Sequence, residues 1–447
     1  MKAVLAALAF CMMFVPTMVA EEVWDVAVIG GGPAGLGAAL ASAKCGARTV
    51  LVERDARLGG TTVSAEVPAV GLFHAWRRQV IAGPAWDLVT NAVAQAGGRL
   101  PDVSRQTART FVECCVLVNP VVYSALAAET VERAGVELRF NAAACGMERL
   151  LSGWRISLAT ETGVKTLVAR EVVDATGNAT VAAQAGAERV REPDISRQPG
   201  SYFFHLNTKG MKFDAAALDA AHEEAVRNGE LLATDLHIRA SSYVRNGGGW
   251  GCYIPLADNS TPEARAETNR RGRETLLRIM RFIRRQPGLA EAEVVSSAPE
   301  VGVRETYRIV GEKTVREDEY LAGTVHPDSL CYSFWPIDAH DSRTKLAKVV
   351  YHKDGRVGTI PLGAMLPKGV ERLLVAGRSV SSDHRANSAL RVQASCMAMG
   401  QAAGVAAALA ARQDCDPRNV GIDGIKKALE GIGAIVPRLG SNVIPNR

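Results

Sequence analysis

Short apolar runs and a segment of small residues alternate near the start of the chain. Residues Val23 to Ile29 form an apolar, β-branched run that is typical of a buried parallel strand. A glycine-rich break follows, and the alanine-rich segment Leu36 to Lys44 has helical composition. A second apolar run, Arg48 to Val52, predicts another strand that stops at Glu53. The pattern therefore predicts a strand–helix–strand unit over residues 23–54.

The turn between the first strand and the helix has the spacing G-x-G-x-x-G. Gly30 permits the tight turn, Gly32 removes the Cβ that would keep a diphosphate from the backbone, and Gly35 lets the helix lie close to the strand. Pro33 and Ala34 complete the first helical turn, where the missing N–H of proline costs little. The helix N-terminus then offers free N–H groups and about half a positive charge to a diphosphate.

An acidic residue follows where a dinucleotide site requires one. Glu53 stands at the end of the second strand, where its carboxylate can accept hydrogen bonds from a ribose, and Arg54 comes directly after it. An acid at this position favours the unphosphorylated ribose of FAD or NAD over that of NADP. The alternative is a glycine-rich turn in an ordinary βαβ unit.

Other small-residue turns follow predicted strands further along the chain. Gly60 and Thr61, in a loop beyond the acid, can let backbone pass along a cofactor and add a hydroxyl donor. Gly177 lies in the turn after an apolar strand, where a nucleotide-binding sheet meets its ligand. A second glycine fingerprint is not expected, because Gly247 to Gly249 lack a preceding strand of the right kind. The sequence therefore predicts that the chain binds one dinucleotide and has no separate NAD(P)H-binding domain.

The end of the chain returns to the pattern of the beginning. The run Leu373 to Ala376 predicts a buried strand that ends at Gly377 and Arg378. A helix rich in small residues follows Arg391 and starts near Val392. We expect its N-terminus to face the N1–C2 edge of a flavin, where negative charge builds on reduction.

The middle of the chain differs from both ends. The segments SYFFHL and WGCYIPL predict strands with aromatic faces, and Ala264 to Arg285 predicts an amphipathic helix with a solvated basic face. The predicted fold class is α/β, with a three-layer Rossmann-like nucleotide-binding domain and an inserted, β-rich α+β substrate domain. The predicted division is a leader over 1–20, the first domain over 21–198 with an insertion near 74–118, the substrate domain over 199–350, and the rest of the first domain over 351–447.

Composition limits the classes of partner. The chain has 447 residues, of which 47% are hydrophobic and 22% charged, so a large core is expected rather than disorder. Its formal net charge of +5 is modest and does not call for nucleic-acid binding. Nine cysteines are present without a C-x-x-C pair, so neither a zinc site nor a dithiol centre is expected, and Cys114 and Cys115 are expected to pack in the core.

The first twenty residues have the pattern of a secretion signal. Met1 and Lys2 precede the apolar run AVLAALAFCMMFV, and cleavage after Ala20 would place the mature chain directly before the first strand. The run is too short for a comfortable membrane span, so no integral span is expected after its removal. We expect export if this signal is real, and a cytoplasmic protein otherwise.

Several segments together resemble the FAD-dependent oxidoreductases of the glutathione-reductase and fumarate-reductase fold group. They are DVAVIGGGPAGLGAALASAKCGARTVLVERDARLGG, VVDATGNATVAAQAGA, VGVRETYRIVGE, PLGAMLPKGVERLLVAGRSV and SALRVQASCMAMGQAAGVAAALA. The resemblance implies non-covalent FAD and a substrate domain inserted between the FAD segments. In related folds an aspartate often follows the late glycine, where this chain has Arg378. The predicted cofactor-binding residues are Gly30, Gly32, Pro33, Ala34, Gly35, Glu53, Arg54, Gly60, Thr61, Gly177, Gly377, Arg378 and Val392.

Oxidation of a C–H bond by a flavin often needs a base for the departing proton. The candidate bases are His340, His205, His74 and His384. His340 is preferred because it lies between Asp338 and Asp341, which could raise its pKa and fix its tautomer. The alternative for each is a structural or surface histidine.

Three arginines are candidates for contacts with anionic groups. Arg304 and Arg308 could bind a substrate carboxylate through paired hydrogen bonds, and Arg391 could stabilise an anionic reduced flavin. The alternative for the first two is an ion pair with Glu300, Glu305 or Glu312.

The sequence thus predicts an FAD-dependent oxidoreductase that moves a hydride between a small organic substrate and flavin N5. An external acceptor such as oxygen or a quinone would reoxidise the flavin. Reduction of an activated double bond and a non-catalytic flavin-binding protein are the alternatives. His340, Arg304 and Arg391 are the predicted catalytic residues, and no metal is expected.

Overall fold

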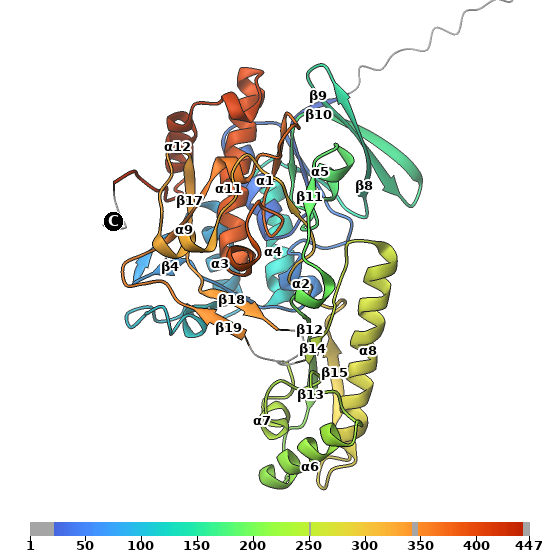
Figure 1. The fold of residues 1–447 in the computed structure, drawn as a ribbon. Helices are drawn as coiled ribbons and strands as arrows, with labels where there is room; N and C mark the ends of the chain where they lie inside the picture. The colour runs from blue at the N-terminus through green and yellow to red at the C-terminus, as the bar shows by residue number, and fades with distance from the viewer. Residues whose placement is uncertain (1–21, 250–251, 342–346, 441–447) are drawn as a thin grey trace, which may run out of the picture.

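The computed structural model describes residues 22–249, 252–341 and 347–440. The predicted leader, residues 1–20, lies outside them. The described chain forms a large body around one mixed sheet, and a smaller lobe projects from that body (Figure 1).

The main sheet has seven strands within the described residues, in the order β7–β2–β1–β10–β9–β8, and β21 also pairs with β10. Strands β7, β2, β1, β10 and β21 are parallel, while β9 and β8 form an antiparallel meander with β10. The strands are β1 (Val23–Ile29), β2 (Thr49–Val52), β7 (Glu137–Arg139), β8 (Ala143–Leu150), β9 (Gly153–Thr160), β10 (Gly163–Asp174) and β21 (Leu373–Val375). This is the predicted Rossmann-like arrangement, in which the carboxyl ends of parallel strands meet at one edge.

Two helices of small residues pack against each other beside this sheet. Helix α1 (Pro33–Lys44) lies against helix α11 (Gln393–Gln413) in the centre of the body (Figure 1). A Cβ at Gly400 would lie 2.0 Å from the carbonyl oxygen of Ala34, so the close approach requires glycine there. Among the described helices, α11 alone has the length and composition of a membrane span, but 94% of that window is buried in the fold.

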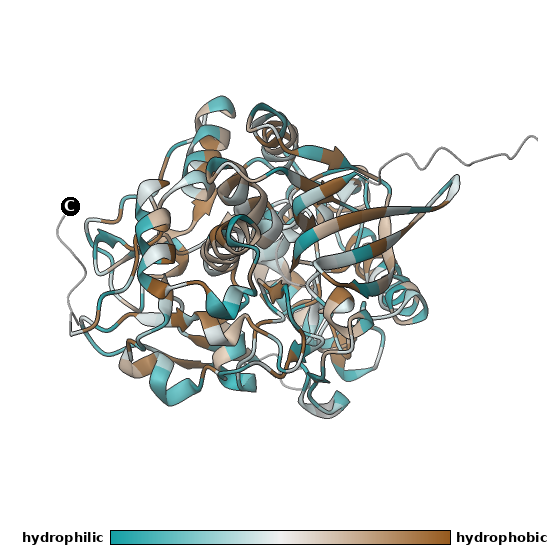
Figure 2. Cartoon of the chain, turned by 90° about the horizontal axis from the view of Figure 1, so that it is seen from above, coloured by the Kyte–Doolittle hydropathy of each residue, from teal (hydrophilic) through white to brown (hydrophobic). Residues whose placement is uncertain are grey.

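The remaining elements of the body cover the sheet and carry the loops around it. The helices are α2 (Thr61–Ser64), α3 (Pro84–Gln95), α4 (Pro120–Arg133), α5 (Thr180–Gln184), α9 (Glu317–Ala322), α10 (His384–Leu390) and α12 (Ile422–Gly431). The two-stranded ladders pair β3 (Ala69–Val70) with β6 (Val116–Leu117), β4 (His74–Ala75) with β5 (Arg78–Gln79), β11 (Arg189–Val190) with β16 (Arg308–Ile309), β17 (Ser329–Ser333) with β20 (Gly358–Pro361), and β18 (Ile337–His340) with β19 (Ala347–Val350). Strand β9 alternates between more and less buried residues, and a similar alternation of hydropathy is visible along the projecting strands in Figure 2.

The smaller lobe is the additional domain, and it contains more helix than predicted. Its elements are β12 (Gly200–Tyr202), β13 (Phe204–Asn207), α6 (Ala215–Arg227), α7 (Ala240–Arg245), β14 (Cys252–Ile254), α8 (Pro262–Arg284) and β15 (Glu293–Ser297). Helix α8 alone has 23 residues, whereas each strand has five or fewer. The prediction of a β-rich domain is therefore corrected, because aromatic segments such as SYFFHL form only short two-stranded ladders.

The core of this lobe ends earlier than the predicted boundary at residue 350. One cluster of buried apolar side chains runs from Tyr202 to Val303. Side chains from Val315 to Leu366 instead pack in the core of the large body, with those of α1 and α11. In terms of packing, the inserted unit therefore covers roughly the first two thirds of the predicted segment 199–350.

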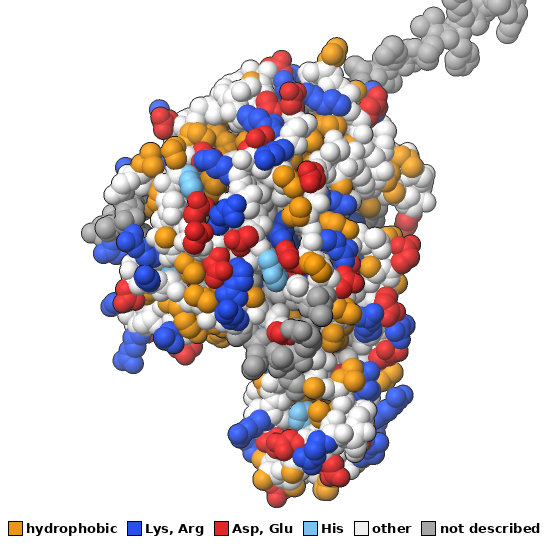
Figure 3. Space-filling model, viewed as in Figure 1, with side chains coloured by type: hydrophobic (Ala, Val, Ile, Leu, Met, Phe, Trp, Pro, Cys, Tyr) orange, Lys and Arg blue, Asp and Glu red, His pale blue; other side chains and the backbone are white. Residues whose placement is uncertain are grey.

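The basic face of α8 is solvated, as predicted, and it also carries ion pairs within the helix. Arg270 lies 2.7 Å from Glu267 and also contacts Glu274, at helical spacings of three and four residues. In Figure 3 acidic and basic side chains are interspersed along this edge of the lobe.

Candidate functional site

A cleft of about 720 Å³ opens at the carboxyl ends of the parallel strands and extends toward the lobe. Every predicted cofactor residue except Gly35 and Val392 lines it. Gly35 lies beneath the cleft, where a Cβ would be only 1.7 Å from the carbonyl oxygen of Gly30. Val392 is the N-cap residue of α11. The local patterns around residues 30, 60, 177 and 377 thus converge on a single cleft.

The glycine turn leaves the start of α1 open to the cleft. Gly32 is the N-cap residue, it has no side chain that could cap the helix, and Pro33 follows at the first helical position. Gly30 has a φ of +105°, which favours glycine. A Cβ on Gly32 would touch only the Cα of Gly60, at 3.8 Å, so the space in front of this residue is open. The first N–H groups of α1 therefore face a cradle suited to a diphosphate.

Glu53 lies at the end of β2, beside this turn. Its Oε2 accepts a hydrogen bond from the N–H of Gly31 at 2.6 Å, and its Oε1 accepts one from the N–H of Asp55 at 2.9 Å. Burial raises the pKa of this carboxyl, although both backbone donors act against the shift. Each carboxylate oxygen has a second lone pair, so a ribose hydroxyl can still be accepted.

Two arginines and an acid from distant segments close the outer wall of the cleft. Arg54 lies 3.6 Å from Glu300 and 3.8 Å from Asp55. Arg265, on α8, also contacts Glu300 and lies 3.6 Å from Asp55. Arg265 was not predicted as part of the cleft, and Glu300 was considered only as an ion-pair partner of Arg304 or Arg308. Their only signal in the sequence is a position in the basic helix and in a glycine-flanked loop.

Arg378 joins the two domains inside the cleft. Its Nε donates to the carbonyl oxygen of Gly177 at 2.6 Å, and its terminal nitrogens donate to Asn178 Oδ1 at 2.8 Å, to Asn259 Oδ1 at 3.1 Å and to the carbonyl oxygen of Val303. Burial lowers the pKa of Arg378 to about 10, so it stays charged at neutral pH. Arg378 thus places a positive charge beside the cleft that is bonded only to neutral oxygens among the described residues, which is compatible with an anionic cofactor.

The start of α11 also reaches the cleft. Val392 has no capping side chain, and the next residue, Gln393, accepts a hydrogen bond from Thr62 Oγ1 at 2.6 Å. Cys396 packs below, where its Sγ lies 3.2 Å from the carbonyl oxygen of Arg391 and burial raises its thiol pKa to about 12. A neutral, buried thiol is typical of a cysteine that packs in a helix interface.

Beyond Arg391 the lobe and the body together form a cluster of polar side chains. Nδ1 of His340 lies 3.0 Å from the hydroxyl of Tyr253, and Nε2 lies 3.3 Å from Asp338 Oδ2. The ring of His237 stacks on that of Tyr253, with centroids 4.5 Å apart. Arg391 belongs both to this cluster and to the cleft wall, since it lines the cleft and contacts the carbonyl oxygen of Asp338 at 3.4 Å.

Asp338 acts to raise the pKa of His340, as expected, but the net shift of this pKa is downward. Burial and the positive charges of Arg304 and Arg391 together lower this pKa to about 4, although Asp338 acts in the opposite direction. The carboxyl of Asp338 stays ionised: burial tends to raise its pKa, but the bond with His340 and the two arginines lower it to about 2. His340 is therefore a neutral imidazole at physiological pH.

Arg304 lies in this cluster, and it has no ion pair with any of the acids considered as alternatives. Glu300 pairs with Arg54 and Arg265, Glu305 with His384, and Glu312 with Arg418. Arg304 instead donates to the carbonyl oxygen of Pro199 and lies over the ring of Tyr253. Its predicted companion Arg308 is turned away, because it bonds to Glu192 and to the carbonyl oxygen of Ser382.

The other candidate histidines lie apart from His340. His205 faces Glu66 at 3.3 Å and is half exposed, and His74 lines a separate pocket with Arg77 and Arg78. His384 contacts Glu305 at 3.2 Å. Tyr253 was not predicted as part of the cluster, because an aromatic residue in a predicted strand looks like a core residue. Gln198, which accepts the backbone N–H of His340 at 3.2 Å, was not predicted either.

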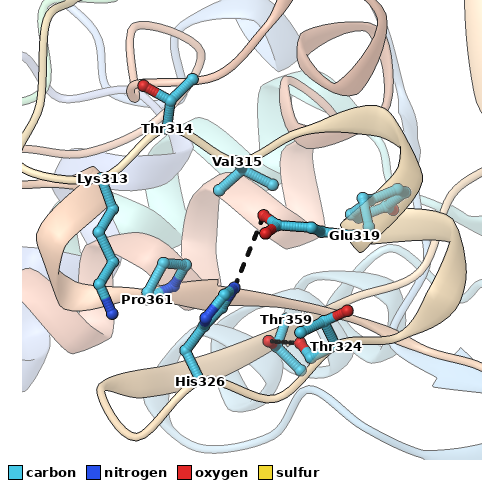
Figure 4. A pocket seen from close by; sticks show the side chains of 9 residues that line it. Lys313, Thr314, Val315, Glu319, Thr324, His326, Thr359 and Pro361 are labelled. Atoms are coloured by element: carbon cyan, nitrogen blue, oxygen red, sulfur yellow. Dashed lines mark hydrogen bonds and ion pairs between the residues drawn. The ribbon is translucent and has the colours of Figure 1, made fainter.

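A second pocket, of about 260 Å³, lies between α9 and β20 and shares no lining residue with the cleft. Figure 4 shows His326 turned toward Glu319, at 3.7 Å, and Thr359 bonded to Thr324. Lys313, at its mouth, pairs with Asp328. Because the charges of this pocket are matched by one another, its geometry does not indicate a ligand.

A family model described as FAD dependent oxidoreductase matches residues 25–429. Digeranylgeranylglycerophospholipid reductase of Methanocaldococcus jannaschii is 28% identical over 183 residues, which are 39% of this chain and 43% of that protein. The chain thus matches less than half the length of this curated relative.

Solved structures of low identity are similar over most of the chain. A geranylgeranyl bacteriochlorophyll reductase-like protein of Thermoplasma acidophilum is 13% identical with a TM-score of 0.42, covering 92% of this chain and 83% of that one. A myxobacterial FAD-dependent halogenase of chondrochloren is 15% identical with a TM-score of 0.42, covering 92% of this chain and 78% of the halogenase.

Proposed function

Since the chain belongs to the FAD dependent oxidoreductase family, we propose that it oxidises a small organic substrate by hydride transfer to flavin N5, with an external electron acceptor. The observation that carries the proposal is the continuity between the cleft and the polar cluster. Arg391 lines the cleft of about 720 Å³ and also contacts Gln198 Oε1 at 3.3 Å within the cluster. A group bound at the end of the cleft would thus lie next to residues able to bind an anion and accept a proton.

FAD is the cofactor of this family, and the cleft residues fit it. The open space before Gly32 and the uncapped start of α1 suit a diphosphate, and Glu53 suits a ribose. The positive charges of Arg378 and Arg391 suit the anionic parts of the molecule. When bound, FAD supplies a two-electron acceptor for the hydride of the substrate and a donor to the external acceptor.

The chain itself supplies the route for the proton. Because Asp338 faces Nε2 of His340, that nitrogen carries the hydrogen, and Nδ1 accepts the O–H of Tyr253. Tyr253 can therefore take the proton of a substrate hydroxyl while passing its own proton to His340. The ionised Asp338 would then stabilise the imidazolium that results.

Reduction of an activated double bond is the second candidate. The curated relative that matches is a reductase, and the same tyrosine could donate a proton in that direction. Tyr253 keeps its proton at neutral pH, since burial raises the pKa of its hydroxyl. The direction of the reaction is thus decided by the donor and acceptor offered to the protein.

Anaerobic bleaching of the bound flavin tests the proposal. Acid precipitation of the purified protein should first release FAD into the supernatant, as expected for non-covalent binding. A panel of small alcohols, amines and hydroxy acids is then screened for a compound that bleaches the visible absorption of the flavin. Protein that holds FAD but is bleached only by dithionite, and that reduces no alkene, would contradict both candidate reactions.

We further propose that the chain is exported, on the pattern of residues 1–20 alone. N-terminal sequencing of the mature protein tests this. A mature chain that begins near Glu21 supports export, and one that begins at Met1 contradicts it.

A further inference from the structure

Nitrogen donors without a charged acceptor gather around Arg391, which is itself one of the residues that line the cleft. Arg304 donates to a backbone carbonyl oxygen, its guanidinium carbon lies 5.1 Å from the ring centre of Tyr253, and no described carboxylate forms an ion pair with it. Arg391 donates to the uncharged Oε1 of Gln198 at 3.3 Å and to the backbone oxygen of Asp338 at 3.4 Å. The acceptors of both guanidinium groups are therefore neutral.

Two more donors in the same place are buried and unpaired. Within the described part of the chain, neither Nε of Arg391 nor Nε2 of Gln198 has a hydrogen-bond partner. A buried N–H without an acceptor costs free energy, so such groups in a native protein require an explanation. A bound ligand with oxygen acceptors supplies one.

The nearby acids are already engaged elsewhere. Asp338 faces Nε2 of His340 at 3.3 Å. Glu305 accepts the backbone N–H of Gln198 at 2.6 Å and contacts Nε2 of His384 at 3.2 Å. Neither carboxylate forms an ion pair with Arg304, although Oε2 of Glu305 is buried and has no hydrogen-bond partner among the described residues.

From this arrangement we propose that the protein binds a carboxylate anion beside Tyr253, held by Arg304 and Arg391. The planar fork of a guanidinium matches the two oxygens of a carboxylate, and the amide of Gln198 adds a third donor. The inference gives the substrate of the proposed oxidoreductase a chemical class, and to that extent it rests on the proposed function. Binding of the anion itself requires only this set of side chains.

The surrounding charges favour a monoanion. The ionised Asp338 and Glu305 lie close to both arginines and would repel a second negative charge on the ligand. A phosphate dianion shares the oxygen chemistry of a carboxylate but carries that second charge. Carboxylates should therefore bind more tightly than inorganic phosphate.

Isothermal titration calorimetry on the full-length protein tests the inference, with acetate and benzoate as probes. Each probe is compared with its uncharged amide, acetamide or benzamide, and with inorganic phosphate. We expect each carboxylate to bind at least about tenfold more tightly than its amide, since a charged acceptor strengthens hydrogen bonds to guanidinium. Equal affinity for acid and amide, or tighter binding of phosphate, would overturn the proposal.

The variant Arg304→Gln identifies the residue responsible. It should lower benzoate affinity by about tenfold to a hundredfold and leave benzamide affinity unchanged. Arg273→Gln is the matched control, because this arginine is exposed on α8 and lines none of the three pockets described above. This variant should bind benzoate as the native protein does. Should Arg304→Gln fail to fold, Arg304→Lys keeps the charge but loses the fork, and a weaker benzoate affinity is again expected. Unchanged affinity in a folded variant would contradict the proposal.

Two independent readouts separate this inference from the proposed function. The FAD content of the same sample is measured by acid precipitation, and carboxylate binding is measured by heat, which needs no flavin turnover. Benzoate binding through Arg304 in a protein whose flavin no donor reduces would support the inference and contradict the oxidoreductase mechanism. Bleaching of the flavin by an uncharged alcohol in a protein that binds no carboxylate would support the mechanism and contradict the inference.

Discussion

The hydroxyl of Tyr253 lies 3.0 Å from Nδ1 of His340, with Tyr253 coming from the projecting lobe and His340 from strand β18 of the body. The two side chains thus meet across the junction of the domains. Because Asp338 holds the proton on the opposite ring nitrogen, the tyrosine is the donor in this hydrogen bond. A charged ligand bound beside this pair should therefore change the pKa of His340.

The first prediction concerns the pH dependence of benzoate binding. The positive charges of Arg304 and Arg391 help to hold the pKa of His340 at about 4, so an anion between them should raise that pKa. The complex then binds a proton that the free protein does not, and benzoate affinity should rise as the pH falls from about 7.5 to about 5.5. Titration calorimetry in two buffers of different ionisation heat should detect this proton uptake.

His340→Gln should remove this pH dependence while keeping the affinity near neutral pH. Of the other groups around the ring, Asp338 titrates far below this range, whereas Arg304, with a pKa of about 10, and Tyr253, whose pKa is raised by burial, titrate above it. His384, paired with Glu305, has a raised pKa and is compared through His384→Gln. A pH dependence that survives in His340→Gln but disappears in His384→Gln would show that His384, and not His340, takes up the proton.

The second prediction separates cofactor binding from folding at the glycine turn. A Cβ on Gly32 would meet only the Cα of Gly60, at 3.8 Å, so Gly32→Ala should fold normally. Its methyl group would occupy the space that the diphosphate needs, and FAD affinity should fall by about tenfold or more. Without FAD, the variant and the native protein should have the same midpoint temperature of unfolding, as measured by circular dichroism. Native FAD affinity in this variant would place the diphosphate elsewhere.

Gly35→Ala gives the opposite behaviour and serves as a comparison. Its Cβ would lie 1.7 Å from the carbonyl oxygen of Gly30, so the variant should lose stability even without FAD. Gly424→Ala on α12 has no atom within 4 Å of the new Cβ, and it should be neutral or stabilising by up to about 1 kcal/mol.

The third prediction concerns Arg378 at the junction of the two domains. Its donors bind oxygens of Gly177, Asn178 and Asn259, and a lysine cannot reach all of them from one nitrogen. Arg378→Lys should therefore lower the free energy of unfolding by about 2 kcal/mol or more and weaken FAD binding. Urea unfolding with and without excess FAD measures both effects. A variant with native stability would show that these bonds contribute little.

The parts of the site that the sequence predicted are those encoded by neighbouring residues. Gly30, Gly32 and Glu53 follow from a strand, a turn and a second strand within one short segment, so local spacing was enough to place them. Arg378 was also recognised as unusual, but its acceptors Asn178 and Asn259 are separated from it by 200 and 119 residues. Only tertiary packing brings such groups together.

The polar cluster was predicted in part for the same reason. His340 was chosen for its flanking acids, yet burial and Arg304 shift its pKa downward, and neither effect can be read from adjacent positions. For Tyr253, 87 residues away, the sequence pattern predicts only a strand with an aromatic face. The lobe boundary shows the same limit, since the segment around Tyr320 packs with distant residues of the body core.

The last prediction concerns stability in mild acid and uses His352, which is 4% exposed and packs against Tyr320 and Phe334. Burial lowers its pKa to about 4, whereas an unfolded histidine titrates near 6.5, so the unfolded chain binds an extra proton between these values. Stability should therefore fall as the pH drops from about 7 to about 5, and His352→Leu should reduce that fall by about 2 kcal/mol. Comparing native and variant protein cancels opposing groups such as Glu171, whose pKa burial raises to about 9. Urea unfolding at both pH values with FAD in excess is the measurement, and an identical pH dependence in the two proteins would show that the pKa of His352 is the same in the folded and the unfolded protein.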